Sequence, residues 1–443
     1  MSLSGLIAAA ADAEAGDPAL TTMLAEVGAP ELAIAGPAAL RPLAVASLAL
    51  GSGRTVLAVT STGREADELV QSLQSLLPAD SVALYPGWET LPHERLSPRP
   101  DTIGRRLAVL RRLRHPSSHD EATGPLRVVV APVRSVLQPQ VPDLGELEPV
   151  SIAIGDAGRE LEEIVQALAA AGYARTELVE KRGDFAVRGG ILDVFPPTEE
   201  HPLRVEFWGD EVEEIRYFKV ADQRSLEIAP GGLWAPPCRE LMLTDQVRSR
   251  AAELLVAHPE LGELLEPISQ GIQVEGMESL APVLVDELQL VLAEFPAGTH
   301  LLICDPERVR ARAADLVATS EEFLAASWAA AAGGGKAPVD LGSASLRSLE
   351  EVAELAARLG LPWWTLSPFS TDNELLSDGH RVGAVTSSFE AAPSYRGDTD
   401  ALLSDIAGWQ RAGWRVALVF DGHGTAERAL ERLRGVDIPA RLQ

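Results

Sequence analysis

Short apolar segments separated by amphipathic helices constrain the fold of this chain more than any other feature. Within residues 1–150, TVLAVTS (55–61), SVALYP (81–86) and RVVVAPV (127–133) have the length and composition of buried strands, and READELVQSLQSLL (64–77) is an amphipathic helical segment. Strands that alternate with helices form parallel sheets, because each return to the sheet needs a crossover. This region therefore predicts the first half of an α/β domain.

The pattern changes at residue 151. Over 151–236 a helical segment (158–173) is followed by the short segments FAVRGG, ILDVFP and LRVEFWGDEVEEIRYF, and the dipeptide Gly209-Asp210 divides the last of these. A Gly-Asp turn between two partly alternating runs is typical of a β-hairpin. We therefore predict a small inserted α+β domain with an antiparallel sheet.

The α/β pattern returns after the insert. Residues 237–375 are mostly helical in pattern, with THLLICDPERV (299–309) as a buried strand, and we interpret them as the second half of the α/β domain. Residues 376–443 contain a helix, the apolar strand candidate WRVALVFDG (414–422) and a second helix. They predict the start of a further small α/β domain, which we expect to be truncated.

Composition excludes several classes of protein. A chain of 443 residues with a formal net charge of −27 is too long for one core and too acidic to bind nucleic acid along its whole surface. The two cysteines, Cys238 and Cys304, offer no metal cluster or disulfide framework and fit a reducing compartment. No uncharged apolar stretch approaches 18 residues. We expect a cytoplasmic protein without membrane contact.

The segment ALGSGRTVLA (49–58) is similar to a phosphate-binding loop, G-x-x-x-x-G-K-[ST], with two letters changed. Gly53, Arg54 and Thr55 stand at the G-K-[ST] positions, and Leu48 stands at the first glycine. Arginine does not replace the lysine conservatively, because its planar guanidinium is bulkier than an ammonium group. We expect a strand-entry turn without a ligand.

The carboxylates of such a site would follow a later strand as Asp-Glu. The best candidate strand ends in Asp305, and Pro306 follows it. Both halves of the nucleotide site are therefore degenerate, and we expect no cofactor. Two alternatives remain open at this point: an active helicase-family ATPase with an atypical loop that uses Arg54 and Asp305, and weak anion binding.

An arginine-rich run covers residues 94–114. It holds seven arginines, and its apolar residues Ile103, Leu107, Leu110 and Leu113 have helical spacing. A basic helix can contact DNA or an acidic partner. The favoured interpretation is a helix whose arginines pair with the acidic surface of the same protein. The histidines show no metal-ligand spacing, and no catalytic constellation is visible, so we predict neither a metal site nor a catalytic residue.

Three segments resemble a known family. YPGWETLPHERLSPRPDTIGRRLAVLRRL (85–113), RGDFAVRGGILDVFPP (182–197) and LRVEFWGDEVEEIRYF (203–218) closely resemble the amino-terminal part of bacterial transcription-repair coupling factors (Mfd). That part is similar to the excision-repair subunit UvrB. The resemblance implies a degenerate helicase-like, P-loop-type parallel-sheet domain in two sequence segments, interrupted by an insert that docks UvrA. In this family the module is described as having lost nucleotide binding.

The resemblance also implies what the complete proteins do. A polymerase-binding domain and an ATP-driven DNA translocase, absent from these residues, would displace stalled RNA polymerase, and ATP and Mg²⁺ would bind in those motor domains. RNA polymerase and duplex DNA are thus expected as partners only through absent domains. UvrB carries an aromatic hairpin that grips damaged DNA. Tyr85 and Trp88 are the only aromatic residues in the matching stretch here, so we expect no damage clamp.

The resemblance places the UvrA contacts on the sheet of the insert. UvrB has a further arginine where Ala186 stands here, and Arg182 is a partial substitute. Arg204 and Glu206 are two residues apart on a predicted strand, so their side chains should share a face. The matching positions are Arg175, Arg188, Arg204 and Glu206.

Overall fold

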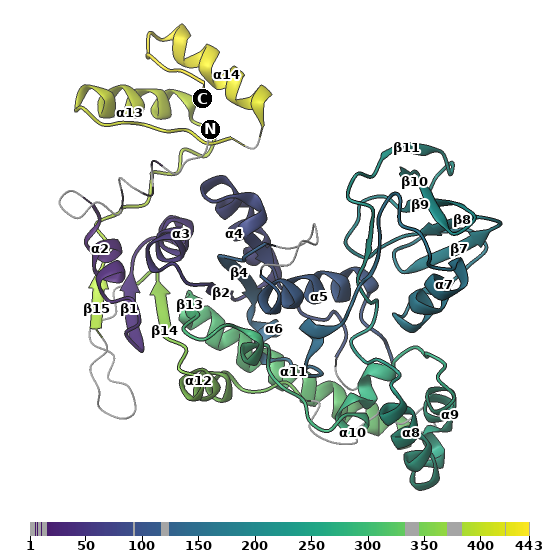
Figure 1. Ribbon diagram of the computed structural model, residues 1–443. Helices are drawn as coiled ribbons and strands as arrows, with labels where there is room; N and C mark the ends of the chain where they lie inside the picture. Colours follow the sequence, from purple (N-terminus) through teal and green to yellow (C-terminus); the bar gives the residue numbers. More distant parts are fainter. Residues whose placement is uncertain are drawn as a thin grey trace. The chain divides into compact units, whose positions relative to one another are not determined.

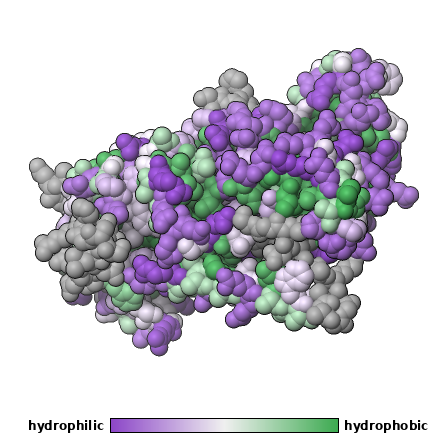
Figure 2. All heavy atoms as spheres, turned by 90° about the horizontal axis from the view of Figure 1, so that it is seen from below, coloured by the Kyte–Doolittle hydropathy of each residue, from purple (hydrophilic) through white to green (hydrophobic). Residues whose placement is uncertain are grey.

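The computed structural model divides into two compact units, one within Ser4–Phe389 and one within Glu390–Gln443. Hydrophilic residues cover much of the face seen in Figure 2, with smaller hydrophobic areas between them. In the described part of the chain, no helix is both long and apolar enough to cross a membrane. The structure describes residues 5, 7, 10, 16–91, 94–116, 124–332, 345–369, 383–420 and 422–442.

A seven-stranded sheet forms the centre of the first unit, with the order β15-β1-β14-β13-β2-β4-β3 and parallel pairing throughout (Figure 1). The central strands β2, β4 and β13 are buried at every residue, as expected for continuous apolar runs between two helical layers. The structure confirms the predicted α/β class. The strands are β1 (Glu31–Ala35), β2 (Val56–Thr60), β3 (Val82–Leu84), β4 (Val128–Pro132), β13 (His300–Cys304), β14 (Trp363–Ser367) and β15 (Gly383–Thr386).

Helices cover both faces of this sheet. The helices α2, α3 and α4 pack together on one face, while α5, α6, α11 and α12 bury their apolar residues against the other in one core. Residues of α5 at the predicted apolar spacing, including Ile103 and Leu107, lie in that core. The helices are α2 (Pro18–Ala25), α3 (Arg41–Ser52), α4 (Gly63–Leu76), α5 (Pro100–Arg114), α6 (Val133–Leu137), α11 (Pro306–Ala332) and α12 (Leu349–Arg358).

The insert forms a second, separate sheet, with the order β11-β10-β9-β8-β7-β6 (Figure 1). All its pairs are antiparallel except β6 with β7, and helix α7 (Leu161–Ala170) packs on one face. Gly209, at φ +67°, makes the predicted turn between β9 and β10. The α+β insert is therefore confirmed. Its strands are β6 (Ala174–Arg175), β7 (Asp184–Arg188), β8 (Ile191–Val194), β9 (Leu203–Trp208), β10 (Glu211–Phe218) and β11 (Ser225–Ile228).

Both ends of the insert meet in a short antiparallel pair. Strand β5 (Val150–Ile152) enters the insert and β12 (Leu233–Ala235) leaves it. A helical group with its own core follows, made of α8 (Asp245–Ala257), α9 (Gly262–Ser269) and α10 (Ala281–Leu284). The 3₁₀ turns are η1 (Ala38–Leu40), η2 (Ala79–Ser81), η3 (Leu144–Glu146), η4 (Pro259–Leu261), η5 (Met277–Leu280) and η6 (Val291–Glu294).

The second unit consists of α13 (Thr399–Arg411) and α14 (His423–Gly435) around a small core. The predicted strand at 414–422 is wrong: residues 414–420 are not a strand, and Trp414 is exposed. A strand needs a neighbour for its backbone hydrogen bonds, and the described residues of this unit supply none. Strand β15 pairs with β1 in the large sheet, so the sheet continues past the expected boundary at residue 375.

Candidate functional site

The insert sheet presents one face that α7 does not cover. Cross-strand pairing places Asp193 opposite Arg204, and Ile191 opposite both Arg188 and Glu206. Residues directly opposite one another share a face. Arg188, Arg204 and Glu206 therefore lie together on the face away from α7, as the two-residue spacing of Arg204 and Glu206 predicts.

Asp193 organises the arginines of this face. The Nε and Nη2 groups of Arg204 donate to its two carboxylate oxygens at 2.7 and 2.9 Å, and Nη2 of Arg188 donates to it at 3.0 Å. The Asp193 side chain is 1% exposed, Arg204 is 17% exposed and Arg188 is 50% exposed. The hydrogen bond that Arg204 donates to Asp193 raises the pKa of Arg204 despite partial burial. Arg188 is thus available to a partner, whereas Arg204 is mainly an internal support.

Packing reinforces this internal role of Arg204. Its guanidinium lies over the ring of Phe218, 4.8 Å from the ring centre, and its Nη1 group donates to the backbone oxygen of Gln223 at 3.3 Å. A planar guanidinium stacked on an aromatic ring and held by a bidentate carboxylate has little freedom to reach outward. Arg204 therefore positions Arg188 through their shared carboxylate.

The other two predicted arginines lie apart from this group. Arg175, on the edge strand β6, is exposed and pairs in register with Phe185, which faces the core under α7. Arg182 donates to the backbone oxygen of Glu199 at 3.0 Å and stacks over Phe195. The structure thus brings Arg188, Arg204 and Glu206 together but leaves Arg175 on the opposite side of the sheet.

Sequence reasoning missed Asp193 and Trp208. Trp208 follows Glu206 by two residues on β9, so the alternation that placed Arg204 and Glu206 on one face already included it. Asp193 is a charged residue within the apolar segment ILDVFP. Its burial beside two arginines becomes visible only when the strand register is known.

The segment that is similar to a phosphate loop lies at the other end of a helix. A phosphate loop follows a strand and precedes a helix. Here Leu48 is buried within α3, Gly53 ends that helix at φ +64°, and β2 begins at Val56. Thr55 donates to the backbone oxygen of Leu126 at 3.0 Å. The segment is thus the strand-entry turn that the sequence predicts, and the positions of Leu48, Gly53, Arg54 and Thr55 do not have the strand-loop-helix order of a phosphate loop.

Arg54 also lies far from Asp305. Arg54 precedes β2 and Asp305 follows β13, and these neighbouring parallel strands run in register from Val56 opposite His300. The two residues are thus at opposite ends of strands about 16 Å long, at about 3.3 Å per residue. Arg54 acts instead on His300, the first residue of β13. Burial, and after it the charge of Arg54, lowers the pKa of His300 to about 4. An ATPase site that combines Arg54 with Asp305 is excluded.

The strand-loop-helix order of a phosphate loop occurs instead between β1 and α3. In open α/β sheets, ligands bind at the carboxyl ends of the strands, which is where this loop lies. A Cβ atom added to Gly36 would lie 2.6 Å from Cδ2 of Leu40 and 3.0 Å from Cβ of Ser387. Leu40 is buried. Side chains of the chain itself therefore fill the space beside this glycine.

An ion-pair cluster occupies the same edge of the sheet. Arg41, the first residue of α3, pairs with the buried Asp305 at 3.2 Å. Arg308 contacts both Asp305 and Glu65, and Ser61 donates to Glu65 at 2.5 Å. Burial raises the pKa of Glu65, but the Ser61 hydrogen bond and the charges of Arg308 and Arg41 lower it further than burial raises it. Asp305, the carboxylate that would organise a metal, is thus paired with the internal cation Arg41. Pro306 begins α11 directly after Asp305.

Comparisons with known proteins give one match to the insert and others to most of the chain. The UvrB interaction domain family matches residues 150–230, which form the insert. The transcription-repair-coupling factor of Mycobacterium bovis is 47% identical over 430 residues, covering 93% of this chain and 34% of the relative. The chain belongs to the transcription-repair-coupling factor family.

More distant members of the family match shorter parts. The Bacillus subtilis protein of the same name is 26% identical over 303 residues, covering 64% of this chain and 25% of the relative. The Escherichia coli protein is 29% identical over 245 residues, covering 54% of this chain and 20% of the relative. The chain spans about a third of the length of the Mycobacterium relative.

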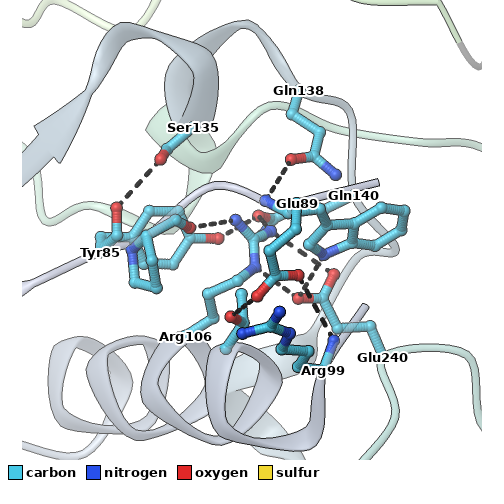
Figure 3. Close-up of polar contacts among 11 residues, drawn as sticks. Tyr85, Glu89, Arg99, Arg106, Ser135, Gln138, Gln140 and Glu240 are labelled. Atoms are coloured by element: carbon cyan, nitrogen blue, oxygen red, sulfur yellow. Dashed lines mark hydrogen bonds and ion pairs between the residues drawn. The ribbon is translucent and has the colours of Figure 1, made fainter. Parts of the chain in front are cut away.

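In this member of the family, the two aromatic residues of the stretch after β3 have internal polar partners. The guanidinium of Arg106 lies 4.5 Å from the ring centre of Tyr85, whose hydroxyl donates to Gln140 at 2.5 Å (Figure 3). Trp88 donates through Nε1 to Glu240 at 3.3 Å. Tyr85 and Trp88 are both buried. Neither ring is available to stack on a nucleic-acid base.

The same cluster ties the insert to the large domain. Arg106 of α5 is fully buried and donates through Nε to Glu240 at 2.5 Å, just after the chain leaves the insert (Figure 3). A Cβ atom added to Gly104 would lie 2.2 Å from Pro197 of the insert, so the helix and the insert are in close contact there. The hydroxyl of Thr102 donates to Glu89. Helix α5 thus supports the insert from one side.

Most arginines of α5 are used within the protein. Arg111 pairs with Glu148 at 3.0 Å, and Arg114 pairs with Glu294 at 2.7 Å. Arg112 donates to the backbone oxygen of Gly124 at 3.2 Å. Together with Arg106, these contacts favour the interpretation of internal pairing over a DNA-binding stripe, because phosphate binding needs free cations.

Proposed function

We propose that this chain is a non-catalytic docking module that recruits UvrA in transcription-coupled nucleotide excision repair. The complete protein would displace stalled RNA polymerase with a DNA translocase that lies outside these residues. ATP, Mg²⁺ and duplex DNA would bind there. A cytoplasmic location is part of this proposal.

The observation that carries the proposal is the insert face around Arg188. The UvrB interaction domain family covers this insert, and its name indicates a protein-binding role. Arg188 is half exposed, while a buried carboxylate holds one of its nitrogens in place. A preorganised charge loses little freedom on binding and contributes to specificity and encounter rate. The face thus has the properties of a protein contact.

Replacing Arg188 with glutamine tests this function. We expect Arg188→Gln to weaken UvrA binding by about 10-fold or more, because a charged contact is lost at the interface. Folding should be preserved, since Arg204 still pairs with Asp193 through both carboxylate oxygens. Affinity is measured by calorimetry or biolayer interferometry.

The matched control is Arg175→Gln, which removes the same charge from an exposed position on the other side of the sheet. It should change UvrA affinity by less than about 2-fold, because isolated surface charges contribute little. Equal binding by wild type and Arg188→Gln would contradict the proposed docking face.

We also propose that the module binds no nucleotide. Two observations support this: Leu40 packs beside Gly36 in the loop after β1, and Arg41 pairs with Asp305 at the same edge of the sheet. Calorimetric titration with ATP and Mg²⁺ should show no saturable heat, and Arg54→Ala should leave this result unchanged. Saturable binding at micromolar concentrations would refute this part of the proposal.

A further inference from the structure

Trp208 is the most exposed large apolar side chain in the insert, at 78%. It is the last residue of β9, next to the left-handed Gly209 of the hairpin turn. Single exposed apolar residues are common on protein surfaces. Trp208 differs from these because it stands at the end of a paired strand, opposite Glu211, with charged residues around it.

Trp208 lies on the same face and at the same end of the sheet as Arg188. Ile191 is opposite both Arg188 and Glu206, and Trp208 follows Glu206 by two residues on one strand. The backbone N–H of Phe207 donates to Gly190 at 2.8 Å, so the two hairpin ends are adjacent. Arg188, Ile191, Glu206 and Trp208 therefore form one surface, which we call the tip surface.

The charges near the indole favour a protein partner over a nucleic acid. Asp210 and Glu211 are exposed in and after the turn, and Glu213 follows on β10, also exposed. Carboxylates beside a stacking platform repel phosphates, and single-strand binding needs a positive groove along with aromatic rings. A ring surrounded by acids is therefore poorly suited to grip DNA.

Tryptophan and arginine are the residues that most often dominate the energy of protein interfaces. The tip surface holds one of each, beside a partly exposed carboxylate. We propose that Trp208 is the apolar anchor of the UvrA contact. Its partner surface offers an apolar pocket for the indole, an acidic group opposite Arg188 and a basic group opposite Glu206. This inference rests on the proposed docking function.

The test compares UvrA binding by Trp208→Ala and Trp208→Phe with that of the wild-type chain. We expect Trp208→Ala to weaken binding by about 30-fold or more, as for a central anchor. Trp208→Phe should recover part of the affinity, because a smaller ring still fills much of an apolar pocket. Thermal unfolding should change little, since the side chain is mostly in solvent.

Ile228→Ala is the control, since Ile228 is 47% exposed and lies opposite Arg216 on the same face, further from the tip surface. It should bind UvrA as the wild type does. Arg188→Gln is measured in the same series. Loss of binding with Arg188→Gln but not with Trp208→Ala would overturn the anchor and leave the docking function standing. If neither variant loses binding, the tip surface is not the UvrA contact, and the anchor fails with it. If the wild-type chain itself does not bind UvrA, the docking function fails.

Discussion

Arg106→Met is expected to destabilise the first unit by about 3–5 kcal/mol, because it leaves the buried carboxylate of Glu240 without its cation. Both side chains of this pair are almost completely inaccessible to solvent. Trp88 also donates to Glu240, but a single neutral hydrogen bond does not compensate a buried charge. Urea unfolding followed by circular dichroism measures the free energy of unfolding.

Two further variants make this test specific. The double variant Arg106→Met with Glu240→Leu should recover part of the loss, since removal of both charges ends the electrostatic penalty. Arg105→Met removes the exposed neighbouring arginine and should change the free energy of unfolding by less than about 0.5 kcal/mol. If Arg106→Met lowers the free energy of unfolding by no more than Arg105→Met does, the Arg106–Glu240 pair does not hold the insert in place.

Arg204→Glu should unfold the insert rather than simply remove a contact. The new carboxylate would face Asp193, which is buried and would lose its bidentate partner. Uncompensated buried charge of this kind costs about 3–5 kcal/mol. Thermal unfolding should show a lower transition for the insert, and UvrA binding should be lost as a consequence.

Arg204→Lys separates charge from geometry. Lysine keeps the positive charge but not the two parallel hydrogen bonds, so we expect an intermediate loss of stability. If Arg204→Glu unfolds at the wild-type temperature, the buried role of this arginine is disproved, and Arg204 returns to the set of direct contacts.

Local patterns were sufficient for much of the fold. Continuous apolar runs such as 127–133 became fully buried central strands, because parallel strands are covered on both faces. The Gly209-Asp210 turn and the alternation of LRVEFW defined a hairpin with one charged face. Each of these signals depends on neighbours within a few residues, so the sequence contains them directly.

One predicted strand failed, and the similarity of GSGRT to a phosphate loop did not extend to the fold, because a local string has no fixed tertiary meaning. The letters GSGRT occur at the exit of a helix here, although the same type of string forms a cradle when it follows a strand. The apolar segment after α13 has the composition of a strand, but the described residues of its unit offer no partner. Propensity alone does not supply the backbone hydrogen bonds that a strand requires.

The sequence by itself determined the α/β class, the insert and the fact that Arg204 and Glu206 share one face of a strand. Only the tertiary structure decided which groups meet. Arg41 and Asp305 are 264 positions apart, and Arg106 and Glu240 are 134 apart. Such pairs form because the sheet order and the insertion bring distant segments together, and burial then makes each charge depend on the other. No spacing along the chain encodes that dependence.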